Sequence, residues 1–115
     1  MKVRFGKEPQ TLEREVTGSF GSFFITVRAP TAIERARIRH FIMREEYDRL
    51  AELRRSLVVG WRDVTDEEEK PIPFNGRNLD IVCGANSDIE SGIMATVGRF
   101  TDENLTLVAG DEGKN

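Results

Sequence analysis

The sequence predicts an α+β fold: an N-terminal antiparallel β-hairpin or meander packed on a long helix, followed by a proline-containing connector and two shorter C-terminal helices. Three observations support this prediction. Apolar residues alternate over residues 12–17 and 22–28, a capping box at 31–34 opens a segment with helical periodicity, and two prolines separate that segment from the C-terminal part. The 115 residues, 38% hydrophobic and 32% charged, suit one soluble domain. We expect it to cover residues 1–109, with a frayed tail at 110–115.

The first two strands form the predicted hairpin. Strict alternation over residues 22–28 gives one apolar face, which consists of Phe23, Ile25 and Val27. Residues 12–17 alternate in the same way, and their shared face consists of Leu12, Arg14 and Val16. The four residues 18–21, Gly-Ser-Phe-Gly, supply the turn between the strands. Val3 and Phe5 are compatible with a third strand, which would extend the hairpin to a small meander.

A long helix is predicted after the hairpin. Thr31 and Glu34 have the spacing of a capping box, in which each side chain accepts a hydrogen bond from the backbone N–H of the other residue. We expect the helix to run to about Arg55. On a straight helix its apolar residues form a stripe and a group beside it: Ala32, Ala36, Met43, Tyr47, Leu50 and Leu57 in the stripe, and Ile38, Ile42 and Leu53 beside it. This broad surface either lies between two layers of the domain or binds another chain, and the sequence leaves both interpretations open.

A connector, residues 61–74, leads to the first of the two shorter helices. Pro71 and Pro73 fix φ and favour an extended conformation in the residues before them. Asn75 then provides an N-cap, because its side-chain oxygen can accept from a free backbone N–H in the first turn of a helix. We expect Trp61 to fill a gap between layers, with an acceptor for its indole N–H.

The last helix is predicted to begin at a second capping box, residues 87–90. It carries a narrow apolar stripe that consists of Ile89, Ile93, Val97 and Phe100. Gly92 and Gly98 lower its helix propensity, so we expect this helix to depend on docking against a core.

The residue types argue against catalysis, metal binding and any cofactor. His40 is the only histidine and lies among arginines, and Cys83 is the only cysteine and follows apolar residues, so neither has an activating partner. One histidine and one cysteine cannot complete a zinc site, and the contiguous acids at 66–69 lack the alternating spacing of a calcium loop. No glycine-rich phosphate loop is present. We therefore expect a non-enzymatic protein without cofactors.

The cysteine count and the hydropathy predict an intracellular protein. A single cysteine excludes an intrachain disulfide and does not imply an oxidising compartment. No apolar run approaches the roughly 18 residues of a membrane span, and the N-terminus lacks the apolar core of a signal peptide. We expect no association with membranes.

The charge distribution keeps a nucleic-acid hypothesis open as an alternative. The net charge is −3, but residues 28–62 hold nine arginines and five acids, a balance of +4, so the remainder carries −7. The arginines of the predicted long helix do not share one face, and acids lie between them, which weakens a stripe that could follow a phosphate backbone. A solvated or internally paired charge distribution explains the same pattern.

Residues 58–79 carry the strongest functional signal. They contain Gly-Trp-Arg-Asp-Val, an acidic turn, Lys-Pro-Ile-Pro-Phe and a leucine-bearing helix, and this segment resembles the central motif of tail assembly chaperones from long-tailed bacteriophages and prophages. That family usually has glycine at the position of Glu69 and serine or threonine at the position of Asn75. Asn75 keeps the oxygen that a cap needs. A glutamate is strained where φ is positive, so we expect the turn around Glu69 to be rebuilt.

The resemblance implies a helper protein that acts in the cytoplasm of the bacterial host and is not part of the mature virion. Its implied partners are the tape measure protein, whose apolar stripes it masks reversibly, and the tail tube protein, which polymerises around the tape measure. It also implies self-association. The alternatives from other classes are a structural tail or connector component that stays in the particle, and a small basic nucleic-acid-binding module.

Six residues are the candidates for partner binding. Three lie on the predicted long helix and three in or next to the connector: Ile38, Phe41 and Ile42 in the first group, and Trp61, Ile72 and Phe74 in the second. They are chosen because a chaperone needs an apolar surface for amphipathic helices. The alternative for each of them is ordinary packing in the core.

Overall fold

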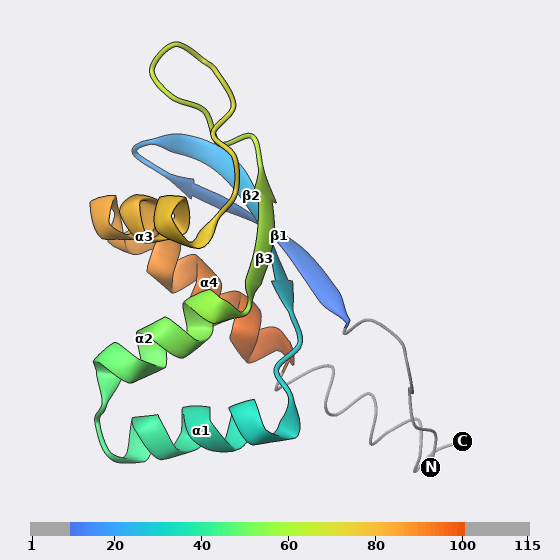
Figure 1. Cartoon of the computed structure of the whole chain (residues 1–115), viewed down its shortest axis with the longest axis vertical. Coiled ribbons are helices and arrows are strands. Elements are labelled where there is room, and N and C mark those ends of the chain that lie inside the picture. The colour runs from blue at the N-terminus through green and yellow to red at the C-terminus, as the bar shows by residue number, and fades with distance from the viewer. Residues whose placement is uncertain (1–9, 101–115) are drawn as a thin grey trace.

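The computed structural model of the chain describes residues 10–100, and it confirms the α+β class. A three-stranded antiparallel sheet is combined with four helices (Figure 1). In chain order the elements are β1 (Thr11–Gly18), β2 (Gly21–Arg28), α1 (Ala32–Met43), α2 (Tyr47–Ser56), β3 (Val58–Arg62), α3 (Gly76–Ala85) and α4 (Ser87–Arg99). The strand considered at Val3 and Phe5 and the tail at 110–115 lie outside the described residues.

The predicted hairpin is confirmed in its strands, its turn and its faces. β1 and β2 pair from Thr11 with Arg28 to Gly18 with Gly21, and Gly21 has φ +101°, a conformation that favours glycine. The predicted apolar face of β2 is buried and consists of Phe23, Ile25 and Val27. The third strand is β3, which pairs with β2 and has a bulge opposite Thr26 and Val27.

The outer face of the sheet is polar and carries a network around Arg62. The Arg62 guanidinium donates two hydrogen bonds of 2.9 Å to the carboxylate of Glu13, which joins the two edge strands across β2. Its central carbon lies 3.7 Å from the centroid of the Phe24 ring, and it therefore covers the one aromatic ring of this face. Because polar and charged groups satisfy each other there, this face needs no helix to cover it.

The single helix predicted to run to about Arg55 is wrong, because the structure divides it into α1 and α2. Glu45 has φ +56°, the N–H of Glu46 donates to the Phe41 carbonyl at 2.9 Å, and the N–H of Glu45 donates to the Ile42 carbonyl at 3.2 Å. These two bonds form a Schellman motif with glutamate at the position that usually holds glycine. The Thr31 capping box at the start of α1 is confirmed in both of its hydrogen bonds.

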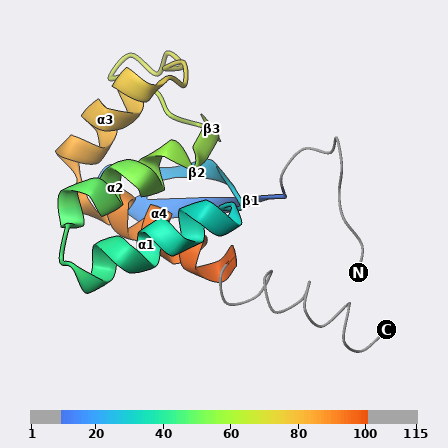
Figure 2. The same cartoon turned by 60° about the horizontal axis from the view of Figure 1, so that its bottom comes forward.

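The division separates residues that a straight helix would place on one stripe. Leu50 and Leu57 are buried in the core, whereas Met43 and Tyr47 are exposed at the corner between the helices. α1 packs mainly alongside α2 (Figure 2). The broad apolar surface predicted for one helix is thus largely a consequence of treating two helices as one.

The predicted cap of α3 is confirmed, and the predicted cap of α4 is corrected. Asn75 caps α3, since its side-chain oxygen accepts from the Asn78 N–H at 2.8 Å. The capping box predicted at residues 87–90 is wrong: Asn86 is the N-cap of α4 and accepts from the Asp88 N–H at 3.0 Å. Asn86 has an extended backbone, which ends α3 and starts α4 at the same residue. The predicted apolar stripe of α4 is buried, with Ile89, Ile93, Val97 and Phe100.

The core lies between the apolar face of the sheet and helices α2 and α4. α4 contacts β1 and β2, α2 contacts β3 and α4, and α3 packs on α4. A methyl group on Gly92 would lie 3.0 Å from Cγ2 of the buried Val16, so the missing side chain lets α4 approach β1 closely. Gly92 therefore contributes to docking as well as lowering the intrinsic propensity of α4.

Ion pairs fasten α1 and α2 to their neighbours. The Arg28 guanidinium at the end of β2 donates two hydrogen bonds of 2.8 Å to the Glu34 carboxylate in the first turn of α1. These bonds lower the pKa of Glu34 to about 2. Arg55 of α2 lies 3.3 Å from a Glu90 oxygen on α4 and 3.6 Å from an Asp80 oxygen on α3.

We predict that Gly92→Ala lowers the free energy of unfolding by about 1–3 kcal/mol, because overpacking against Val16 outweighs the gain in helix propensity. Gly84→Ala is the matched control, since a methyl group on Gly84 of α3 meets no atom within 4 Å. It should leave stability unchanged or raise it by up to about 1 kcal/mol. Urea unfolding of both variants measures the difference, and equal stability would contradict the close approach of α4.

We predict that Glu34→Gln costs about 1.5–3 kcal/mol at pH 7, the range for a hydrogen bond to a charged group. The pKa of Glu34 is lowered in the folded protein from 4.5 to about 2. Its contribution is therefore complete above pH 4.5 and is lost as the pH falls towards 2. Unfolding measured from pH 7 to pH 2 should show the difference from wild type shrinking in that window. Glu52→Gln on α2 is the control, and a Glu34→Gln deficit that does not change with pH would contradict the assignment.

Candidate functional site

The structure places the two groups of predicted binding residues far apart. Ile38, Phe41 and Ile42 lie on α1, at one end of the molecule, while the connector and the loop it carries lie at the other end (Figure 1). The six residues therefore do not form one surface. Each group has to be judged by itself.

The α1 group offers little of the predicted surface. Ile38 is 9% exposed and belongs to the core, and Phe41 is half-buried against the core. Only Ile42 is open, at 47% exposure. Phe41 also borders a shallow cavity of about 310 Å³ between α1 and α2, whose other lining residues are Arg37, Arg49, Glu52, Leu53 and Ser56. Four of its six lining residues are polar or charged, which does not suit a site for apolar side chains.

Besides Ile42, α1 exposes two apolar residues that were not predicted as binding residues, and a third lies at the start of α2. Ile33 is 70% exposed and Met43 is 77% exposed on α1, and Tyr47 of α2 is 60% exposed. The periodicity of a single long helix assigned Met43 and Tyr47 to the same stripe as Leu50. The break at Glu45 reverses that assignment, and no glycine or proline marks the break in the sequence.

The connector group is brought together around Trp61. The indole N–H donates to the carbonyl oxygen of Ile72 at 2.9 Å, which supplies the acceptor predicted for it. The Trp61 ring makes edge-on contacts with Phe74 at 5.2 Å and with Phe23 at 6.4 Å between centroids. Trp61 thus holds the segment after the loop against the sheet, and Trp61 and Phe74 themselves pack against the core.

Residues 63–70 of the connector form an acidic loop that projects from the body of the molecule (Figure 1). Its base is closed by the Ile72 N–H, which donates to the Val64 carbonyl at 2.8 Å, and its tip is organised by Asp66. One carboxylate oxygen of Asp66 accepts from the backbone N–H of Glu68 at 2.8 Å and of Lys70 at 3.0 Å. The loop is therefore an ordered turn.

The expectation that this turn is rebuilt around Glu69 is wrong. Glu69 has φ +63° in the structure, so the turn keeps the left-handed conformation and places a glutamate in it. The backbone N–H of Glu69 donates to the Asp66 carbonyl at 3.0 Å, which helps to hold it there. The side chain is exposed and carries its charge into solvent.

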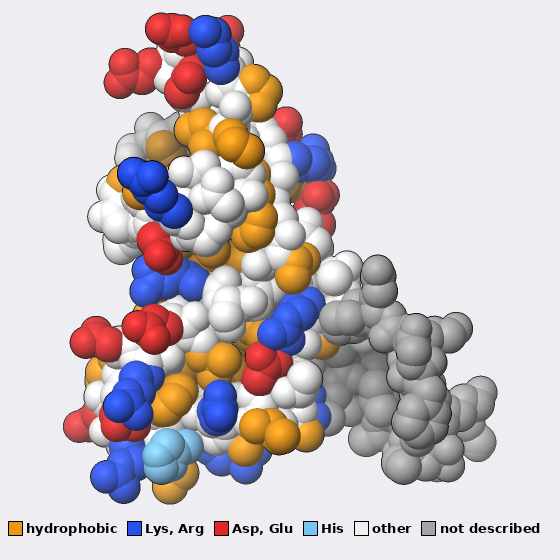
Figure 3. Space-filling model, viewed as in Figure 1, with side chains coloured by type: hydrophobic (Ala, Val, Ile, Leu, Met, Phe, Trp, Pro, Cys, Tyr) orange, Lys and Arg blue, Asp and Glu red, His pale blue; other side chains and the backbone are white. Residues whose placement is uncertain are grey.

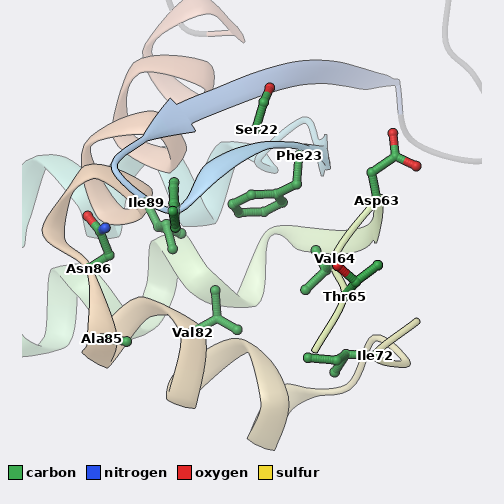
Figure 4. Close-up of a pocket in the computed structure, with 11 residues that line it drawn as sticks. Ser22, Phe23, Asp63, Val64, Thr65, Ile72, Val82, Ala85, Asn86 and Ile89 are labelled. Carbon is green, nitrogen blue, oxygen red and sulfur yellow. The ribbon is translucent and has the colours of Figure 1, made fainter. Parts of the chain in front are cut away.

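A pocket of about 330 Å³ lies between the hairpin turn, the connector and the junction of α3 with α4 (Figure 4). Its apolar lining consists of Phe20, Phe23, Val64, Ile72, Val82 and Ile89. Its polar lining includes Ser22, Asp63, Thr65 and Asn86. Apolar walls with a few polar groups are typical of a binding site.

Only one of the six predicted residues, Ile72, lines this pocket. Trp61 and Phe74 act behind it, since they fix the connector that forms one wall. The sequence reasoning missed Phe20 and Val82. The one signal in the sequence for Phe20 was that a large aromatic residue stands in a tight turn. In the structure the Phe20 side chain is 42% exposed there.

The pocket lies at the acidic end of the molecule. The acidic loop holds five acids against Lys70, a net charge of −4. Figure 3 shows acidic side chains gathered at this end and several Lys and Arg side chains at the α1 end. Some of the arginines have partners within the chain: Arg35 donates to the Pro30 carbonyl at 2.9 Å, and Arg55 lies between two carboxylates.

The remaining chemical groups give no reactive site in the described part of the chain. Cys83 is 5% exposed, and burial raises the pKa of its thiol to about 12, so the thiol is protonated at neutral pH. Among residues 10–100 no three histidine, cysteine, aspartate or glutamate side chains gather as a metal site would require. No helix among these residues has the length and apolarity of a membrane span.

We predict that Glu69→Gly stabilises the protein by about 0.5–1 kcal/mol. Glycine removes the cost of a left-handed conformation, about 1–2 kcal/mol for other residues, and loses part of that gain to its greater freedom in the unfolded chain. Glu67→Gly is the matched control in the same loop: it removes the same charge, also without an ion pair within residues 10–100, at a residue without positive φ and should destabilise slightly. Chemical unfolding compares them, and a destabilised Glu69→Gly would contradict the backbone conformation of the loop.

Comparison with protein-family models, with curated proteins and with solved structures finds no match. The inference of function therefore depends on the chain's own residues.

Proposed function

We propose that this chain is a tail assembly chaperone of a long-tailed bacteriophage or prophage. It is a non-enzymatic protein that reversibly binds the tape measure protein in the cytoplasm of the bacterial host and masks its apolar stripes until tail tube subunits polymerise around it. It is not retained in the mature virion. The observation that carries this proposal is that the motif segment, residues 58–79, forms one wall of an open apolar pocket and carries the acidic loop beside it.

The residues of the motif have physical roles that agree with the resemblance to the chaperone family. Trp61 needs the carbonyl of the residue between the two prolines, and the aromatic residue after the second proline packs on the indole. The positive φ of Glu69 occurs where the chaperone family usually has glycine, and Asn75 caps a helix where that family has serine or threonine. At both positions the residue type differs from that of the family while the backbone conformation or the cap suits the family's residue, and this supports the resemblance.

The surface also has the properties that a reversible binder of amphipathic helices needs. The pocket is apolar enough to take up client side chains, and Phe20 at its rim is partly exposed. Its polar rim and modest size favour release over permanent burial. The nucleic-acid alternative has less support, because arginines such as Arg28, Arg35 and Arg55 make contacts inside the chain.

Co-expression with the tape measure protein of the same genome tests this function. We expect the tape measure protein to be largely insoluble alone, and soluble and co-purifying when this chain is present. Purified mature particles should lack the chain. A tape measure protein that is equally soluble with and without it would contradict the chaperone function, and recovery of the chain from finished tails would favour a structural component.

A further inference from the structure

We propose that the pocket binds an amphipathic helix whose apolar stripe is flanked by lysines or arginines, and that the acidic loop pairs with those cations. The inference rests on the proposed function only for the identity of the client, the tape measure protein. It adds the chemistry by which a client segment is selected and the end of the molecule at which it binds.

The mode of binding follows from what lines the pocket. Side chains from the hairpin turn, β2, the connector, α3 and α4 form its walls, while the two edge strands of the sheet, β1 and β3, contribute none. The backbone of Val64 next to the pocket is already hydrogen-bonded to Ile72. An added strand would therefore find no edge strand to pair with in the pocket, whereas apolar side chains that project from a helix can enter a pocket of this size.

Two segments that contribute residues to the pocket also carry carboxylates without cationic partners: the acidic loop and the first turn of α4. In the acidic loop, Asp63 lies 3.3 Å from Arg62, and Glu68 lies 3.2 Å from Lys70. Glu67 and Glu69 of the same loop make no ion pair within residues 10–100.

The second of these segments carries Asp88, in the first turn of α4 and next to the lining residue Ile89. Asp88 has no ion pair among the described residues either, and it lies at the hairpin turn, where a methyl group on Gly18 would be 3.0 Å from its Oδ2. Free carboxylates thus belong to two of the segments that form the apolar pocket.

Charge complementarity selects the client. The pocket is lined by Asp63 and adjoins a loop of net charge −4, so the basic flanks of a helix bound there are attracted and acidic flanks are repelled. The α1 end, with its exposed Ile33 and Met43 and nearby arginines, has the opposite preference. The two ends therefore predict opposite outcomes for an acidic helix, which makes the assignment of the client to one end testable.

Two synthetic helices test the proposal on the full chain. Both carry the same leucine stripe and no tryptophan, and they differ only in lysine or glutamate flanks. Trp61 is the only tryptophan, and its bond to Ile72 makes its fluorescence a reporter of the pocket wall. We expect the basic helix to bind at least about tenfold more tightly than the acidic one and to weaken as salt rises. Equal binding of both helices, or tighter binding of the acidic one, would overturn the charge assignment.

Variants locate the site. Val82→Lys, which charges the pocket, should abolish binding of the basic helix, whereas Ile81→Lys, at an exposed neighbour on α3, should not. Phe20→Ser in the turn gives the same test if Val82→Lys does not fold. Replacing Glu67 and Glu69 by glutamine should weaken binding about three- to tenfold, and Glu52→Gln on α2 should not. Binding that survives Val82→Lys and Phe20→Ser in folded protein would overturn the pocket.

The co-expression assay separates this inference from the proposed function. If the folded pocket variants keep the tape measure protein soluble as well as the wild type does, the pocket inference fails and the chaperone function stands. If the basic helix binds as expected but the tape measure protein gains no solubility from this chain, the pocket inference stands and the chaperone function fails.

Discussion

The pocket exists because Trp61 fixes the connector against the sheet. Its indole N–H satisfies the carbonyl of Ile72, and its ring packs edge-on between Phe23 of β2 and Phe74 at the entry to α3. Two prolines stiffen the chain on either side of Ile72, so this one hydrogen bond and two ring contacts determine where the acidic loop stands and where α3 begins. Without that attachment the wall of the pocket formed by Val64 and Ile72 would have no fixed position.

The two ends of the molecule differ in charge and in the exposure of apolar side chains, and this difference is the basis for choosing between them as the client site. One end combines an open apolar pocket with free carboxylates, and the other combines exposed apolar side chains on α1 with arginines. A concave pocket removes more apolar surface of a guest from water than a convex helix face does. This difference favours the pocket as the client site, and for this reason we propose that the client binds at the motif segment and not at the Arg-rich helices.

Local patterns predicted the elements that local physics determines. Alternation identified β1, β2 and their buried face, and the caps at Thr31 and Asn75 were visible because a side-chain oxygen satisfies an N–H three residues away. The break at Glu45 was not predictable in this way, because no local signal marks it. Its reason lies in the tertiary structure: the break allows Ile38 of α1 and Leu50 of α2 both to be buried. The pocket was missed for a related reason. Phe20, Ile72 and Val82 meet through the docking of α3 and α4, and no regular spacing of these residues in the sequence indicates that they meet.

Hydrogen–deuterium exchange of the chain, alone and in complex with co-purified tape measure protein, measures most directly where the client binds. Binding at the pocket predicts slower exchange in the complex over residues 18–23, 63–74 and 82–89, with residues 32–49 unchanged. Slower exchange confined to residues 32–49, with the connector and the α3–α4 junction unchanged, would place the client on α1 and contradict the role given to Trp61 and the acidic loop.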